Sequence, residues 1–174
     1  MSVIERPNAT SMGDKQLTLL GPALKPGDAM PDFTLTDNSL KPVTKGDGQG
    51  KVRIFSVVPS LDTPVCDLQT RRFNEEAGKL GDKVKVLTVS VDLPFAQKRW
   101  CGAANATHVQ TLSDYQTGKF GEATGTLIKD LRLLSRAIFV VDGGGTIRYV
   151  EYVPKIGEHP NYEAALQATR SLVP

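Results

Sequence analysis

The stretch FSVVPSLDTPVCDL, residues 55–68, lies where an apolar run gives way to a segment with helical periodicity. Residues 52–58 are rich in β-branched and aromatic side chains, a pattern typical of a strand buried on both faces of a sheet. Thr63 and Pro64 then provide a helix N-cap and a first helical residue. The sequence therefore places Cys66 in the first turn of an amphipathic helix that directly follows a buried strand.

Strands and helices alternate outward from this stretch. Further strands are expected at residues 32–37, 84–91, 108–112, 134–141 and 146–153, and further helices at 94–101, 115–120 and 162–172. A small N-terminal hairpin is expected within QLTLLGPALKPGD, residues 16–28. This order predicts an α/β protein with a thioredoxin-like fold: a central mixed sheet flanked by helices, with an N-terminal β-hairpin. We expect one domain at 16–174 after an N-terminal extension at 1–15.

The composition is that of an ordinary soluble globular chain. An apolar share of 40% with 23% charged residues is far from the signature of disorder, and 174 residues suit one domain. A formal charge of +2 provides no strong field for nucleic acid or an anionic membrane, so neither is an expected partner. The longest apolar run, residues 137–141, is the size of a strand, and the N-terminus does not read as a secretory signal. We therefore expect a cytoplasmic protein.

Two cysteines are too few for a disulfide scaffold, so their surroundings must indicate their role. At the start of a helix, unpaired backbone N–H groups and the helix dipole favour the thiolate of Cys66 over the thiol. The thiolate is the form that attacks other groups. The alternative is that Cys66 is a small buried hydrophobe, since free cysteine is among the most buried residue types.

Pro59, Thr63 and Cys66 fit the P-x-x-x-T-x-x-C motif of the peroxiredoxins. The octapeptide PSLDTPVC resembles the thiol peroxidase (Tpx) branch, whose members are atypical two-cysteine peroxiredoxins. The resemblance runs from about residue 16 to the end of the chain, through DLPFAQ at 92–97 with Cys101 shortly after, SRA at 135–137 and NYEAAL at 161–166.

The resemblance implies a role for each of five residues. Cys66 would attack the O–O bond of a hydroperoxide, with Thr63 as its hydroxyl partner. Pro59 would shield the reactive sulfur, and Arg136 would supply a guanidinium that stabilises negative charge on sulfur and on the departing oxygen. Cys101 would resolve the resulting sulfenic acid through an intramolecular disulfide that thioredoxin reduces. Because a disulfide needs Cα atoms within about 7 Å, we expect local unwinding around both cysteines.

The same resemblance implies reduction of hydrogen peroxide and alkyl hydroperoxides in antioxidant defence, by a homodimer without cofactor or metal. Two other functions are alternatives to this interpretation. A thioredoxin-type thiol–disulfide oxidoreductase would use C-x-x-C, whereas positions 63 and 69 are Thr and Gln here. A non-enzymatic redox sensor would undergo stoichiometric oxidation of the two cysteines with negligible turnover.

The remaining candidate motifs indicate structure more than chemistry. His108 and His159 lie far apart, and neither has acidic or cysteine neighbours at a metal-binding spacing. The glycine-rich residues 46–51 precede a strand and lack the Ser or Thr of a phosphate loop, so we expect a flexible loop.

Overall fold

The computed structural model describes residues 2–173. Its strands are β1 Glu5–Met12, β2 Lys15–Leu20, β3 Thr34–Thr36, β4 Pro42–Thr44, β5 Val52–Val57, β6 Val84–Ser90, β7 Val109–Ser113, β8 Leu127–Ile128, β9 Ala137–Val141 and β10 Ile147–Tyr152. Its helices are α1 Pro64–Leu80, α2 Pro94–Ala104, α3 Lys119–Thr124 and α4 Tyr162–Leu172, with a 3-10 turn η1 at Lys45–Gly48.

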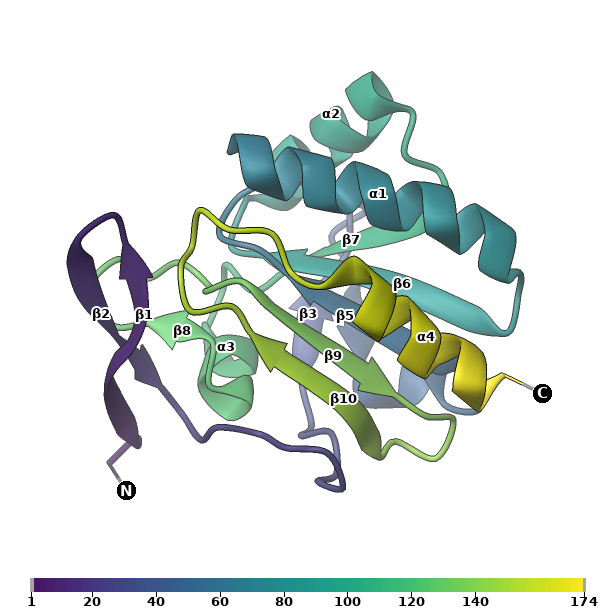
Figure 1. The fold of residues 1–174 in the computed structure, drawn as a ribbon. Coiled ribbons are helices and arrows are strands. Elements are labelled where there is room, and N and C mark those ends of the chain that lie inside the picture. The colour runs from purple at the N-terminus through teal and green to yellow at the C-terminus, as the bar shows by residue number, and fades with distance from the viewer. Residues whose placement is uncertain (1, 174) are drawn as a thin grey trace.

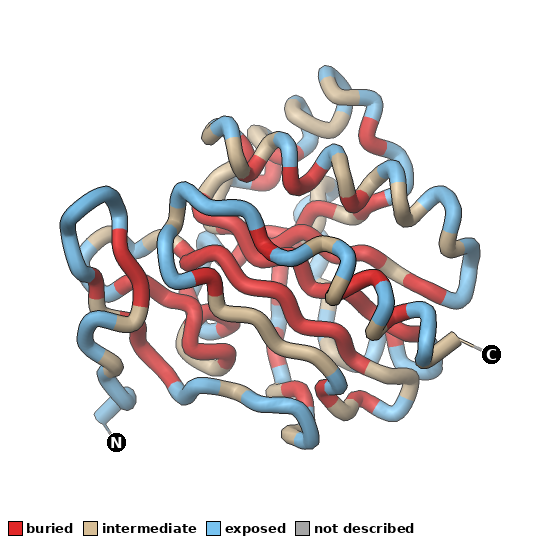
Figure 2. The backbone as a smooth tube through the Cα atoms, viewed as in Figure 1, coloured by how far each residue is buried: buried red, intermediate tan, exposed pale blue. Residues whose placement is uncertain are grey.

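A seven-stranded sheet forms the centre of the molecule, in the order β10-β9-β5-β6-β7-β3-β4 (Figure 1). Strands β5, β6 and β7 are parallel, whereas β9 pairs with β5 and with β10 in antiparallel fashion. Every residue of β5 and β9 is buried, and Figure 2 shows this buried centre beneath helices with exposed outer faces. The predicted mixed sheet flanked by helices is confirmed.

The two faces of the sheet are covered by different helices. Helices α1 and α4 lie on one face, where Phe73 of α1 and Leu166 of α4 share a core with the sheet. On the other face, Phe120 of α3 packs against Phe33 and Phe55, with ring centroids 5.6 and 6.1 Å from its own. Because β5 carries core residues on both faces, its position is fixed from both sides.

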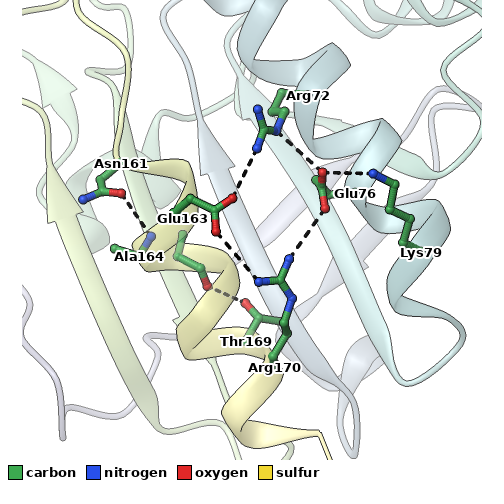
Figure 3. A network of polar contacts seen from close by, with 9 residues as sticks. Arg72, Glu76, Lys79, Asn161, Glu163, Ala164, Thr169 and Arg170 are labelled. Carbon is green, nitrogen blue, oxygen red and sulfur yellow. Dashed lines mark hydrogen bonds and ion pairs between the residues drawn. The ribbon is translucent and has the colours of Figure 1, made fainter.

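Charged side chains join α1 to α4 outside this core (Figure 3). Arg72 lies 3.4 Å from Glu163 and 3.7 Å from Glu76, and Arg170 lies 3.8 Å from Glu76. The Asn161 side chain caps α4 by accepting a backbone N–H of its first turn at 3.0 Å. Such ion pairs near the surface are individually weak, and here they add a network of charges to the apolar packing that α1 and α4 share with the sheet.

The N-terminal hairpin lies earlier in the chain than expected. It pairs β1 with β2 across the two-residue turn Gly13-Asp14, and of its two strands only residues 16–20 of β2 fall within residues 16–28. Gly13 adopts a φ of 59°, which a two-residue hairpin turn requires and glycine tolerates. Residues 5–12, which we had placed in the extension 1–15, therefore form a strand. The domain limits 1–15 and 16–174 themselves stay a prediction.

Two other local expectations were wrong. The helix expected at 115–120 begins at Lys119, because Asp114 accepts the backbone N–H groups of Phe120 (3.3 Å) and Gly121 (2.9 Å) and so fixes its start. The flexible loop expected at 46–51 instead begins with the turn η1. Gly48 of this turn is buried against the Arg53 side chain, and an added Cβ would lie 2.6 Å from Cδ of that arginine.

The buried Asp114 carboxyl predicts a specific pH dependence of stability. Burial raises its pKa from 3.8 to about 6, so the folded state binds the extra proton between those values. The contribution of Asp114 to the free energy of unfolding therefore falls as the pH rises through this range, by about 3 kcal/mol. Asp114→Asn should remove this fall, which urea unfolding at several pH values would measure. An unchanged slope in the variant would contradict the prediction.

Candidate active site

Cys66 lies in the first turn of α1, as predicted. Thr63 is the N-cap residue with an extended backbone (φ −100°, ψ 149°), and proline occupies the first helical turn. The Cys66 side chain is 0% exposed and packs with Val58 and Leu61, while Trp100 of α2 packs against the same cluster. Apolar side chains therefore enclose Cys66 where Val58, Leu61 and Trp100 pack against it.

The exception to this apolar enclosure is Arg136, the residue before β9. It is 1% exposed, and its Nη2 donates to Cys66 Sγ at 3.2 Å. Its other hydrogen bonds go to Gln69 Oε1 (2.8 Å) and to the Ile156 carbonyl (3.0 Å from Nε and 2.8 Å from Nη2). None of these acceptors is a carboxylate, and within residues 2–173 Arg136 makes no ion pair. Among its contacts, the Cys66 sulfur is therefore the atom best able to balance the buried positive charge.

Gln69 positions the arginine, and our reading of the sequence missed this role. It is fully buried in α1, accepts from Arg136 and donates to Ser56 Oγ of β5 at 2.7 Å. The sequence did contain a signal for this role, because position 69 lies three residues after Cys66 and thus on the same face of the helix. A glutamine on the inward face of an amphipathic helix needs polar partners there.

The loop between β5 and α1 carries the other two predicted residues. Pro59 is buried in it, and the Thr63 hydroxyl donates to the Ser60 carbonyl at 3.1 Å and not to the sulfur. Asp92, just after β6, holds this loop by accepting the Ser60 hydroxyl (2.6 Å) and a backbone N–H of the loop (2.8 Å). The motif residues are therefore fixed from a neighbouring strand of the sheet.

Cys101 lies half-buried in α2, and its sulfur contacts a different part of the structure. Its Sγ is 3.4 Å from the Thr111 hydroxyl of β7. That hydroxyl donates its only proton to Asn38 Oδ1 at 2.9 Å, so the Cys101 thiol is the donor to Thr111. Cys66 and Cys101 are both free, and the structure is that of the dithiol form.

Comparison with known proteins agrees with this geometry. The Redoxin family model matches residues 25–166. The chain is 56% identical to thiol peroxidases of Bacillus subtilis and Halalkalibacterium halodurans, over 90% and 89% of its length and 93% of each relative. A peroxiredoxin-like protein from Aquifex aeolicus superposes with a TM-score of 0.89 at 37% identity, covering 95% of this chain and 98% of that one.

The chain therefore belongs to the redoxins and, within them, to the thiol peroxidases. Membership confirms the predicted thioredoxin-like fold and the predicted class of enzyme, a thiol-dependent peroxidase. The residue roles, the disulfide and the reductant stay predictions.

Gln69→Leu tests whether this glutamine positions Arg136. The substitution leaves Arg136 Nη1 and the Ser56 hydroxyl without a partner in a buried place, so the free energy of unfolding should fall by about 1–3 kcal/mol. The rate at which iodoacetamide alkylates Cys66 in a Cys101→Ser background should change severalfold, because Arg136 is no longer fixed beside the sulfur. Gln110→Leu, on β7, is the control. Equal alkylation rates in Gln69→Leu and the parent would contradict the assignment.

Proposed function

We propose that Cys66 is the peroxidatic residue of an enzyme that reduces hydrogen peroxide and alkyl hydroperoxides. The observation that carries this proposal is the buried Arg136 guanidinium, 3.2 Å from the sulfur and without a carboxylate partner. A positive charge in such a place favours negative charge on the atom that it contacts. The Cys66 thiolate is the nucleophile that a thiol-dependent peroxidase needs.

The reaction begins when the thiolate attacks one oxygen of the O–O bond. An S–O bond forms, the O–O bond breaks, and the departing alkoxide or hydroxide takes up a proton, which leaves Cys66 as a sulfenic acid. Arg136 and the backbone N–H groups of the first turn of α1 stabilise the charge that develops on the departing oxygen. Thr63 would offer its hydroxyl to the same oxygen in place of its hydrogen bond to the Ser60 carbonyl, and Pro59 would shield the site from the side of the loop.

Burial of Cys66 implies that the site opens during the cycle. A side chain with 0% exposure cannot meet a hydroperoxide until the first turn of α1 or the helix α2 moves. Cys101 then resolves the sulfenic acid: its sulfur bonds to Cys66, the S–O bond breaks, and water leaves. Thioredoxin would reduce the disulfide by thiol exchange, returning both cysteines to the dithiol form.

Exposed apolar side chains near the two cysteines support a docking role for this surface. Leu68 of α1 is 54% exposed, and Leu93 and Phe95 at the start of α2 are 53% and 66% exposed. Such side chains favour association with thioredoxin and with a second copy of the chain, so we propose a homodimer recycled by thioredoxin.

Within residues 2–173 no helix has the length and apolar character to cross a bilayer. We propose the cytoplasm as its compartment, where thioredoxin keeps such thiols reduced.

Cysteine substitutions separate the steps of this cycle. Cys66→Ser should abolish peroxide turnover with either thioredoxin or dithiothreitol, because the nucleophile is gone. Cys101→Ser should still reduce one equivalent of peroxide, but it should lose turnover supported by thioredoxin because no intramolecular disulfide forms. Full activity of Cys66→Ser would contradict the catalytic assignment. Wild-type protein that oxidises once and then fails to turn over with excess reductant would favour the redox-sensor alternative.

A further inference from the structure

A polar contact joins α1 and α2, the helices that carry the two cysteines. Trp100 Nε1 donates to Asp67 Oδ1 at 2.7 Å, and Arg71 Nε donates to Asp67 Oδ2 at 2.9 Å. The Arg71 guanidinium carbon also lies 5.6 Å from the centre of the Trp100 ring, within the range of a cation–π contact. We call Asp67, Arg71 and Trp100 the helix latch. Asp67 directly follows Cys66 in the chain, and Trp100 directly precedes Cys101.

The two cysteine sulfurs have different neighbours while the latch is closed. Trp100, and not Cys101, packs against the apolar cluster around Cys66. The Cys101 sulfur instead contacts the Thr111 hydroxyl on β7. For the sulfurs to meet, the first turn of α1 or the helix α2 must turn or unwind, and we expect either movement to separate Asp67, next to Cys66, from Trp100, next to Cys101. The Asp67–Trp100 hydrogen bond must then break.

We propose that the helix latch sets the rate at which Cys101 resolves the Cys66 sulfenic acid. Its members are positioning residues, because they act through the helices and not on the reacting atoms. The inference rests on the proposed disulfide, in which Cys101 Sγ bonds to Cys66 Sγ and water leaves. A closed latch prolongs the life of the sulfenic acid and so gives a second hydroperoxide time to oxidise it to sulfinic acid.

The size of the effect follows from the exposure of the latch. Hydrogen bonds to a charged carboxylate are stronger than neutral ones, but the Asp67 and Arg71 side chains are 31% and 49% exposed and are partly screened by water. We therefore expect loss of the Asp67–Trp100 bond to speed resolution about fivefold and not by orders of magnitude.

Trp100→Phe and Asp67→Ala test the latch from its two sides. Trp100→Phe keeps an aromatic ring beside Cys66 but removes the N–H donor, and Asp67→Ala removes the acceptor. Arg148→Gln is the matched control, because it removes a 2.7 Å arginine–aspartate bond at the β9–β10 hairpin. Reduced protein is mixed with one equivalent of hydrogen peroxide, quenched in acid at intervals and alkylated, and mass spectrometry counts the sulfenic acid and disulfide forms. Once Cys66 has become a sulfenic acid, both latch variants should convert it to the disulfide about fivefold faster than the wild type and the control.

Two further measurements respond to the latch but not to a general loss of stability. Trp100 is the only tryptophan, so its emission should change as the wild type forms the disulfide, and Asp67→Ala should show this change at its own faster rate. Because the latch must open before the disulfide can form, its loss favours the disulfide over the dithiol form. A fivefold shift in the thiol–disulfide equilibrium makes the reduction potential about 20 mV more negative.

The outcomes separate the latch from the proposed function. If the wild type forms the Cys66–Cys101 disulfide but both latch variants form it at the wild-type rate and with the same potential, the latch proposal is wrong and the catalytic cycle stands. If Cys66 is oxidised but the wild type forms no disulfide with Cys101, the resolving role and the latch proposal are both overturned. If Trp100→Phe does not fold, Asp67→Ala and Arg71→Gln decide the question.

Discussion

The contact between the buried Arg136 guanidinium and the Cys66 sulfur is the interaction on which the site depends. A buried charge is costly unless polar partners surround it, and Arg136 obtains these from Gln69, from the Ile156 carbonyl and from the sulfur itself. A neutral thiol would leave this positive charge without a counter-charge among these contacts. This geometry, in surroundings from which water is largely excluded, is the basis of the proposal that Cys66 reacts as a thiolate.

The sheet brings together the groups that this contact requires. Strands β5 and β9 are neighbours, so the start of α1 after β5 and Arg136 before β9 lie at the same end of the sheet. The same packing that excludes water also excludes hydroperoxide, and Trp100 packs against the cluster around Cys66. The proposed cycle therefore needs a rigid sheet and movable helix ends in one molecule. The helix latch is the contact that relates the movement of α1 to that of α2.

Much of the fold and of the site could be predicted from local sequence, and the features that were not predicted have physical causes. The buried strand β5, the cap at Thr63 and the first turn that holds Cys66 depend on periodicity and on proline, which are local signals. The Ile156 carbonyl is a backbone group of a loop, so no residue type marks it. The Trp100–Asp67 bond spans 33 residues, and one sequence does not show which side chains meet at that distance. The misplaced hairpin had a local signal in Gly13-Asp14, which resembles an ordinary polar stretch until its strands are seen to pair.

The most direct test of the central claim is the ultraviolet absorbance of the Cys66 thiolate at neutral pH in a Cys101→Ser background. Arg136→Met should largely remove this absorbance, because the methionine fills much of the same space without a positive charge. It should slow the reaction with hydrogen peroxide by about a hundredfold, the loss typical of a missing transition-state donor. Equal thiolate absorbance and equal peroxide reactivity in the presence and absence of Arg136 would contradict the account.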